Sequence, residues 1–312
     1  MKVKFNYVVL CIFILSQLNT QAQKKIDYVN PFIGTDGHGH TYPGAVYPFG
    51  MVQLSPDNGT EGWDWSGGYH YSDSVITGFS HTHISGTGVG DLYDISVMPT
   101  VNETVSIKPI FSKFSHTTEK ASPGYYSVFL KTSGIKAEFT TSERTGFHRY
   151  TFPASKDAII RFDAGFRLNN NLPIDTEIEI VNDTTILGYK RSTGWGLNKI
   201  MYFAAKLSKP IKSYELYTDG NIRLGGNIAN SRSSKAVLHF STTENEVILI
   251  KVGLSSATKK GAVLSLSEIP NWNFIATQKN AEDAWEKELS KINYSIDSKK
   301  ELEIFYTAFY HT

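Results

Sequence analysis

Between residues 125 and 254 the chain alternates hydrophobic and polar positions in short runs that end at Gly, Pro, Asn, Asp or Ser. The runs are rich in β-branched and aromatic residues, which favour half-buried strands. Because no helical segment separates consecutive runs, the pattern predicts a mainly β fold, a large sandwich of antiparallel sheets. The predicted strands are YYSVFLKT, IKAEFTTS, GFHRYTF, AIIRFDA, EIEIVN, MYFAAKL, IKSYELY, KAVLHFS and EVILIKVGL.

Near residue 271 the hydrophobic period changes from two to about 3.6, which indicates amphipathic helices. The apolar stripe of the first helix is predicted at Ala281, Ala284, Trp285, Leu289 and Ile292. A second helix is expected to begin with the capping box of Ser298 and Glu301. Its apolar stripe comprises Leu302, Phe305, Tyr306 and Phe309. Since no cap or proline follows, we expect the chain to stop where a helical domain begins; a helix that folds back onto the sandwich and ends is the alternative.

The first 22 residues have the pattern of a secretory signal peptide. Lys2 and Lys4 precede an apolar run from Tyr7 to Leu15, and a polar end with small residues follows. A membrane anchor is the alternative, but it needs roughly 20 apolar residues and this run is shorter. Cys11, the only cysteine, lies inside the run, so the mature chain would contain neither a disulfide nor a thiolate nucleophile. We expect a secreted or periplasmic protein, without membrane insertion after cleavage.

Charge and composition remove two classes of partner. The 312 residues carry a formal net charge of +1, and 40% of them are hydrophobic, which is typical of an ordinary folded protein. Basic and acidic residues are spread along the chain, so no positive stripe indicates nucleic acid or an anionic membrane surface. We therefore expect neither as a partner.

Residues 27–100 have a different composition from the strands that follow. Gly, His, Trp, Tyr and Asp crowd together there, above all in EGWDWSGGYHYSD and GFSHTHISGTGVGD. Stretches with so few large apolar side chains can bury little surface, so exposed loops are expected rather than core. Long loops of this kind are typical of binding and catalytic sites.

Two chemistries have weak support in these loops. One is metal binding, because the histidine pairs His38/His40 and His81/His83 each skip one residue, and an extended backbone would point both rings of a pair to one face. Further ligands would come from Asp36, Asp91 and Asp94. The other is nucleophilic hydrolysis by a serine of SHTHISGTG, although no G-x-S-x-G elbow is present.

Carbohydrate recognition fits the same residues better. A sugar presents an apolar ring face and a rim of hydroxyls, so its site combines a flat aromatic with Asp, His and Ser partners in a concave surface. For the tryptophans, core packing is the alternative. The predicted substrate-binding residues are Trp63, Trp65, His81, His83, Ser85 and Asp91. No catalytic residue and no metal ligand is assigned to this chain.

The stretches DYVNPFIGTDGHGHTYPGAVYPFGMVQLSPD, WDWSGGYHYSD, GFSHTHISGTG and GDLYDISVMPT resemble the N-terminal part of glycoside hydrolase family 92, which comprises exo-acting α-mannosidases. The resemblance continues through ASPGYYSVFL, GFHRYTFP, AWEKELSKI and FYTAFYHT. It implies a galactose-mutarotase-like sandwich, a helical linker, and an (α/α)6 barrel that carries the general acid, the general base and a calcium ion. It also implies an inverting reaction, which needs two carboxyl groups separated by enough room for a water.

Pattern and resemblance together predict a signal peptide at 1–22, a sandwich domain at 26–268, and a helical linker with the first barrel helix at 271–312. The expected function is the sugar-pocket part of a secreted, calcium-dependent, inverting exo-α-mannosidase that acts on N-glycans or other α-mannosides. The catalytic pair and the Ca2+ site would lie in the barrel beyond Thr312. A stand-alone carbohydrate-binding or mutarotase-like sandwich without hydrolase activity is the main alternative, and a glycan amidase is a third.

Overall fold

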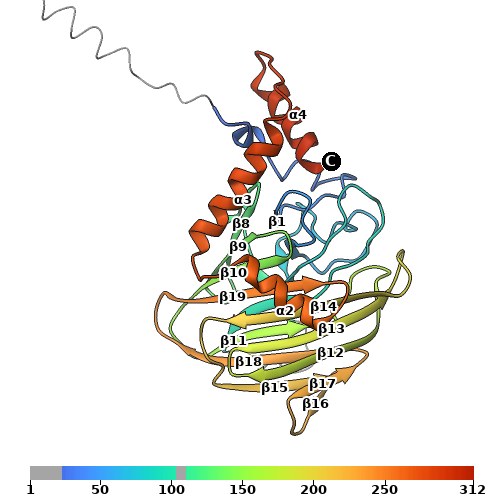
Figure 1. The fold of residues 1–312 in the computed structure, drawn as a ribbon, viewed down its shortest axis with the longest axis vertical. Coiled ribbons are helices and arrows are strands. Elements are labelled where there is room, and N and C mark those ends of the chain that lie inside the picture. Colours follow the sequence, from blue (N-terminus) through green and yellow to red (C-terminus); the bar gives the residue numbers. More distant parts are fainter. Residues whose placement is uncertain (1–22, 103–109) are drawn as a thin grey trace, which may run out of the picture.

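The computed structural model describes residues 23–102 and 110–312, so the predicted signal peptide lies outside the described residues (Figure 1). Two large antiparallel sheets stack on each other, which confirms the predicted fold class. The eight-stranded sheet has the order β1 (Ala45–Val46), β2 (Gln53–Asp57), β4 (Gly78–Ser80), β5 (Ser96–Val101), β11 (Ser155–Asp163), β18 (Ser234–Thr242), β15 (Ser213–Thr218) and β16 (Asn221–Arg223).

The nine-stranded sheet forms the second layer. Its order is β17 (Ile228–Ser231), β12 (Leu172–Asn182), β13 (Thr185–Thr193), β14 (Lys199–Leu207), β19 (Glu246–Ser255), β10 (Thr145–Phe152), β9 (Ile135–Thr141), β8 (Tyr125–Leu130) and β7 (Lys120–Ser122). A small pair joins β3 (Val75–Ile76) to β6 (Ser112–Lys113), and the short helix η2 (His116–Thr118) precedes β7.

The core lies between the two large sheets. Phe79 of β4 meets Phe139 of β9 with 4.5 Å between ring centroids, and Phe162 of β11 stacks on Phe203 of β14. All four rings are fully buried. Burying one such side chain contributes about 1.5–3 kcal/mol, so these inward-facing positions fix the register of the strands.

Each predicted strand is present, but within residues 125–254 the pattern missed the short strands β16 and β17 and the long strand β13. Its sequence TILGYKRST contains Gly188 and a lysine, Lys190, that is fully buried. A buried charge on a strand breaks the alternation of apolar and polar residues from which strands are predicted. The strand is nevertheless central, with β12 and β14 paired along its length.

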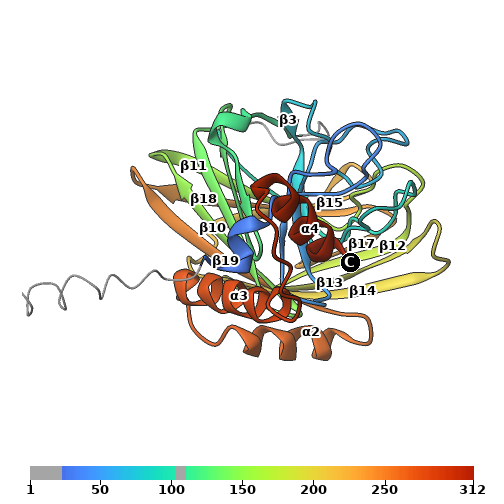
Figure 2. The same ribbon diagram turned by 90° about the horizontal axis from the view of Figure 1, so that it is seen from above.

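Helices follow the last strand, and α2 and α3 lie against the outer side of the nine-stranded sheet (Figure 2). The predicted first helix is α3 (Phe274–Leu289), which buries Ala281, Trp285 and Leu289 as expected. Ile292 lies beyond its end and is 43% exposed, so its predicted place in the stripe is wrong. The short helices α2 (Lys259–Ser265) and η3 (Leu266–Glu268) were not predicted.

The second predicted helix is α4 (Lys299–His311), and the Ser298 side chain caps it by accepting a hydrogen bond from the Glu301 amide. Its aromatic stripe has a partner within the chain. The short helix η1 (Lys25–Tyr28) packs against it, with Tyr28 stacked on the fully buried Tyr306. Phe305 and Phe309 remain half-buried. No helix in the described part of the chain combines the length and apolar character of a membrane span.

Candidate functional site

The loops between β1 and β5 gather at one end of the sandwich, below α4 (Figure 1). The expectation that they are exposed is wrong for three predicted site residues. His81, His83 and Asp91 are 0%, 4% and 1% exposed. Each is buried because it meets a partner that is distant in the sequence.

His81 belongs to a buried hydrogen-bond chain rather than to a surface. Its Nδ1 lies 2.6 Å from the carbonyl oxygen of Ile95, and its Nε2 lies 2.9 Å from Nε2 of His148. Burial is the main cause, and the neighbouring His83 a smaller one, of a pKa for His81 that is lowered from 6.5 to about 4. Since no atom of His81 is exposed, the side chain cannot touch a sugar in this structure.

His83 takes part in a sealed cluster with Asp57 and Ser80. Its Nε2 lies 3.1 Å from both Asp57 Oδ1 and Ser80 Oγ, while its Nδ1 donates to the Gln53 carbonyl. The three residue types are those of a hydrolytic triad, but serine and aspartate face the same ring nitrogen instead of opposite ones. The side chains of His83 and Asp57 have no exposed surface, so a substrate carbonyl has no access. The cluster holds β2 and β4 together.

Asp91 ties the glycine-rich loop to the β13–β14 hairpin. Its carboxylate accepts hydrogen bonds from Lys199 Nζ, the Gly196 amide and Asn171 Nδ2. Burial alone would raise the pKa of Asp91, but these donors outweigh burial and lower it. Asp91 is therefore a buried charged residue that fixes the loops between β1 and β5, which we call the loop layer, to the hairpin.

The residues after Asp91 have an unusual backbone that the sequence did not reveal. Leu92, Tyr93 and Ile95 have φ angles of 77°, 53° and 52°, a region that side chains other than glycine rarely adopt. The buried Lys190 of β13 donates to the carbonyl oxygens of Leu92 and Tyr93 and lies 3.3 Å from Asp94. A strained segment persists only where its surroundings over-determine it, and strain of this kind clusters at functional sites.

Trp63 is the exposed member of the predicted set, at 58%. Its ring makes an edge contact with His40 at 4.3 Å and lies 5.0 Å from His38. Asp64 holds His38, with 2.6 Å between Oδ1 and Nδ1. This aromatic and polar patch is suited to a sugar ring.

Trp65 and the candidate metal ligands have other partners. Trp65 is half-buried, and its indole nitrogen donates to Asp73. The histidines and aspartates that gave weak support to metal binding do not converge: His40 Nε2 is 3.9 Å from Asp64, and His81 and His83 are engaged as described. Within residues 23–102 and 110–312, no three His, Cys, Asp or Glu side chains are grouped so that they could hold a metal ion.

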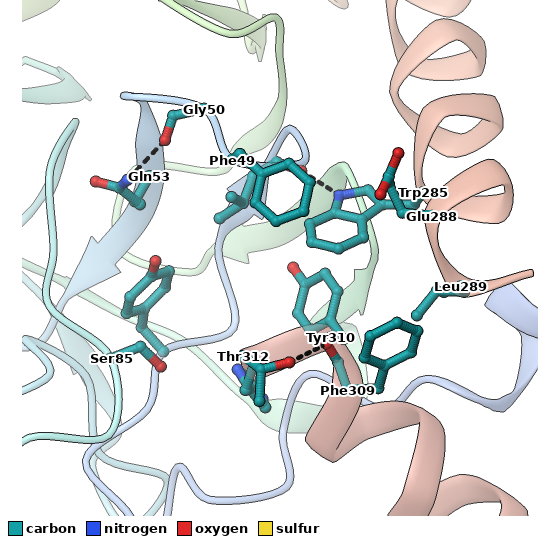
Figure 3. Close-up of a pocket in the computed structure, with 13 residues that line it drawn as sticks. Phe49, Gly50, Gln53, Ser85, Trp285, Glu288, Leu289, Phe309, Tyr310 and Thr312 are labelled. Carbon is teal, nitrogen blue, oxygen red and sulfur yellow. Dashed lines mark hydrogen bonds between the residues drawn. The ribbon is translucent and has the colours of Figure 1, made fainter. Parts of the chain in front are cut away.

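A pocket of about 220 Å³ lies where the loop layer meets α3 and α4 (Figure 3). Gln53 and Ser85 contribute from the loops, and the rings of Phe49, Trp285 and Tyr310 gather across it. The Trp285 indole donates to the Val46 carbonyl at 2.6 Å, which fixes α3 to the loops. Ligand pockets typically enclose roughly 300–1,000 Å³, so this pocket is smaller than a complete ligand site and fits one part of such a site.

Two features of the pocket favour a role as a binding site. Phe49 is 85% exposed and has a φ of 56°, so a large apolar ring is presented in a strained conformation. His311 lines the pocket, and its buried Nε2 has no hydrogen-bond partner in the described part of the chain. Buried polar atoms are nearly always paired, so this ring nitrogen is an unsatisfied group in the pocket wall.

A chain of contacts links the pocket wall to the Trp63 patch. Ser85 lines the pocket, and the next residue, Gly86, donates from its amide to the carbonyl of His40. The ring of His40 in turn contacts Trp63.

The sequence matches the family model "Glycosyl hydrolase family 92 N-terminal domain" over residues 28–255. The model "Glycosyl hydrolase family 92 catalytic domain" matches residues 261–312. The chain belongs to glycosyl hydrolase family 92. In family terms the pocket is notable because Gln53 and Ser85 come from the N-terminal domain, whereas Trp285 and His311 come from the part matched by the catalytic domain.

Solved structures of this family share the fold. A family GH92 α-mannosidase from Bacteroides thetaiotaomicron, in complex with mannoimidazole, is 36% identical, with a TM-score of 0.88 over 93% of this chain. A family GH92 inverting mannosidase from the same bacterium is 24% identical, with a TM-score of 0.80 over 93% of the chain, a likeness that shows the fold alone.

A protein of Arthroderma benhamiae described as an uncharacterized secreted glycosidase is 28% identical over 91% of the chain. The chain spans only 40% of that protein and 40% of the α-mannosidase from Bacteroides thetaiotaomicron, and 39% of the inverting mannosidase. Most of a family 92 enzyme therefore lies in sequence that this chain does not include.

Sequence reasoning found one residue that lines the pocket, Ser85, and missed the others. Gln53 and Phe49 lie in YPFGMVQLSPD, a stretch quoted for its resemblance and not examined for chemistry. His311 was counted as part of an aromatic helix. The only available signal was the polar ring next to that stripe, and helical spacing alone cannot show which neighbour it faces.

Proposed function

We propose that this chain is the N-terminal, sugar-pocket part of an exo-acting α-mannosidase of family 92. Residues 26–268 would form the sandwich unit, and residues 271–312 the linker and first helix of the catalytic barrel. The terminal mannose would bind in the pocket beside Ser85, and the next sugar of the glycan would lie over Trp63. The remaining part of the enzyme would close the pocket and perform the chemistry.

The pocket at the junction of the two family regions carries this proposal. Its wall is incomplete, it holds an unpaired histidine nitrogen and an exposed strained aromatic, and a chain of contacts links it to an exposed tryptophan. The α-mannosidase of similar structure binds mannoimidazole, a compound named for mannose. Exo-acting enzymes take the end of a glycan, so a pocket closed on one side suits them better than an open groove.

The loop carboxylates of this chain have structural partners, which supports a catalytic pair in the remaining part. Asp57 faces His83, Asp64 holds His38, Asp73 accepts from Trp65, Asp91 binds Lys199, Asp94 lies beside Lys190, and Glu61 is 3.7 Å from Arg167. An inverting reaction needs one carboxyl group to protonate the leaving oxygen and another, about 6.5–9.5 Å away, to activate water.

Calcium dependence, inversion and secretion belong to the same proposal for the complete enzyme. No acidic cluster in the described residues fits a calcium ion, so no calcium ligand is assigned to them. The substrates would be α-mannosides, including N-glycans, and the signal peptide predicted at 1–22 would direct export to the periplasm or the medium.

The test compares the chain with the complete enzyme. Residues 24–312 and the full-length protein are purified with calcium and incubated with an aryl α-mannoside and with α-1,2-linked mannobiose. We expect mannose release from the full-length protein only. Release by residues 24–312 that survives repurification and disappears in Asp91→Ala or Asp94→Ala would place a catalytic pair in the loops and overturn the proposal.

The alternative of a stand-alone sugar-binding sandwich is favoured by one observation, the exposed Trp63 patch. It predicts that the chain alone binds mannose as tightly as the full-length protein does. Calorimetric titration of both proteins with mannose separates the two functions, because our proposal expects much weaker binding by the chain alone.

A further inference from the structure

The tip of the β13–β14 hairpin exposes another large aromatic residue near the Trp63 patch. Trp195 is 66% exposed, and Leu197, two residues later, is 82% exposed. Exposing an indole to water leaves a large apolar surface unburied, which is unfavourable because burial of apolar surface stabilises a folded protein. Exposed apolar groups with polar neighbours are typical of interaction sites.

The hairpin tip is held in one conformation. The Gly196 amide donates to Asp91 Oδ2 at 2.8 Å, and Lys199 Nζ bridges Asp91 and the Gly196 carbonyl. The Gly194 amide closes the turn on the same carbonyl at 3.1 Å. Since Asp91 is buried and charged, these bonds are strong, and Trp195 is presented by an ordered turn. A pre-ordered side chain binds a ligand with little loss of entropy.

One short loop joins Trp195 to the Trp63 patch. Asp91 holds the hairpin, and Gly88 of the same loop lies against the Trp63 indole, where a Cβ would stand 2.3 Å from Nε1. Gly88 and Asp91 are three residues apart, so their Cα atoms are separated by roughly 11 Å at most. The hairpin tip that carries Trp195 and the Trp63 indole therefore contact the same glycine-rich strip, residues 88–91.

The rim of this strip is polar. Arg167 and Glu61 are 3.7 Å apart with about half of each side chain exposed, and Lys199 remains 23% exposed beside Asp91. Exposed aromatic faces with charged and amide groups around them suit a sugar chain, which offers apolar ring faces and a hydroxyl rim. A protein partner would more often require a contiguous apolar patch.

We propose that Trp195 is a second aromatic platform, which stacks on a sugar of the glycan beyond the residue at Trp63. The inference rests on the proposed function and deepens it. The natural substrate is then an extended or branched α-mannoside rather than a disaccharide, because only a longer glycan reaches from the pocket past Trp63 to the hairpin tip.

The test uses the full-length enzyme and its variants Trp195→Ala and Trp195→Tyr, with Leu224→Ala as a control. Leu224 is 89% exposed near a different hairpin, so its loss removes a comparable apolar surface away from the strip. The kcat/KM is measured for a 4-nitrophenyl α-mannoside and for a high-mannose oligosaccharide. Melting temperatures are recorded for all variants.

We expect Trp195→Ala to lower kcat/KM for the oligosaccharide about fivefold or more, with the aryl mannoside within about twofold of wild type. Trp195→Tyr keeps an aromatic face and should retain most of the activity on the oligosaccharide. Leu224→Ala should leave kcat/KM unchanged for both substrates. An unchanged oligosaccharide rate overturns the platform. Equal losses on both substrates with a lower melting temperature also overturn it, because Trp195 then packs against the rest of the enzyme. A wild type inactive on both α-mannosides overturns the proposed function instead, and this inference with it.

Discussion

At the scale of single residues, the buried pair His81 and His148 has only one consistent arrangement of protons. The Ile95 carbonyl can only accept, so His81 Nδ1 carries a hydrogen and its Nε2 accepts from His148 Nε2. His148 Nδ1 must then accept from the Tyr150 hydroxyl, 2.8 Å away. An extra proton on His81 Nε2 would place two N–H groups against each other, and one on His148 Nδ1 would reverse its bond with the Tyr150 hydroxyl. The chain of bonds in this direction therefore exists only while both rings are neutral.

We predict that this pair makes the fold sensitive to acid. Burial lowers the pKa of His81 to about 4, from an ordinary 6.5, and that of His148 also lies well below its usual value. As the pH falls from about 6.5 to about 4, the unfolded chain binds protons that the folded chain does not. The free energy of unfolding should therefore decrease over that interval, by on the order of 3 kcal/mol for His81.

Urea unfolding of this chain at pH values between about 7.5 and 4.5 measures the effect. In His148→Gln one titrating ring is gone, so the slope of stability against pH should become shallower. His239→Gln is the matched control, since His239 lies near the surface beside Asp157 and should leave the slope nearly unchanged. The same steep slope in wild type and His148→Gln would contradict this account.

Phe49 is a second residue whose strained backbone conformation should lower the stability of the chain in a way that can be measured. Its backbone is left-handed, and its ring, 85% exposed, buries little surface against the described part of the chain. Phe49→Gly should leave the stability of the chain unchanged or raise it by about 1 kcal/mol, because glycine adopts a positive φ without strain. In the full-length enzyme the same change should lower kcat/KM about tenfold, because a pocket wall is lost.

Phe49→Ala separates the two effects, since it removes the ring and keeps a Cβ in the strained conformation. It should lose as much activity as Phe49→Gly without the gain in stability. Full activity in Phe49→Gly would show that the ring plays no part in the pocket.

At the scale of elements, the β13–β14 hairpin organises the loop layer. Lys190 of β13 reaches the strained segment after Asp91, and Lys199 of β14 holds Asp91 itself. Tyr93 of that segment donates its hydroxyl to the Ser66 carbonyl, next to Trp65. Two lysines of one hairpin thus set the shape of the loops that present the tryptophans.

We predict that Lys190→Met destabilises this chain by about 3 kcal/mol or more. The substitution keeps the volume of the side chain but leaves three carbonyl oxygens and the buried Asp94 without their cation. Lys206→Met is the control. Lys206 donates only to the hydroxyls of Thr184 and Thr185, so its loss should cost less than about 1 kcal/mol. Equal denaturant midpoints for the two variants would refute the role given to Lys190.

An element can be predicted from the sequence when residues close together in the chain determine its structure. A strand such as β12 alternates because one face is buried, and that pattern is visible within a few residues. The burial of His81, His83 and Asp91 depends on His148, Asp57 and Lys199, which lie 67, 26 and 108 positions away. The spacing of residues within a short loop does not depend on such distant partners. The sequence analysis therefore predicted that these buried residues lie in exposed loops.

At the scale of the whole molecule, the family 92 match and the junction pocket belong to one arrangement. The sandwich supplies a loop layer fixed from below by the hairpin, and α3 and α4 meet that layer through Trp285 and Tyr310. The resemblance in the sequence implied that the loops reach toward the barrel. It did not show that Ser85, rather than the histidines, would face the junction.

The central claim is that the loops of this chain form part of the mannose site. A crystal structure of the full-length enzyme with mannoimidazole tests it most directly. We predict that the inhibitor lies in the junction pocket, in contact with Ser85, Gln53 or His311, with its open side toward Trp63. An inhibitor enclosed entirely by residues after Thr312, with no atom of residues 33–95 in van der Waals contact, would contradict the account.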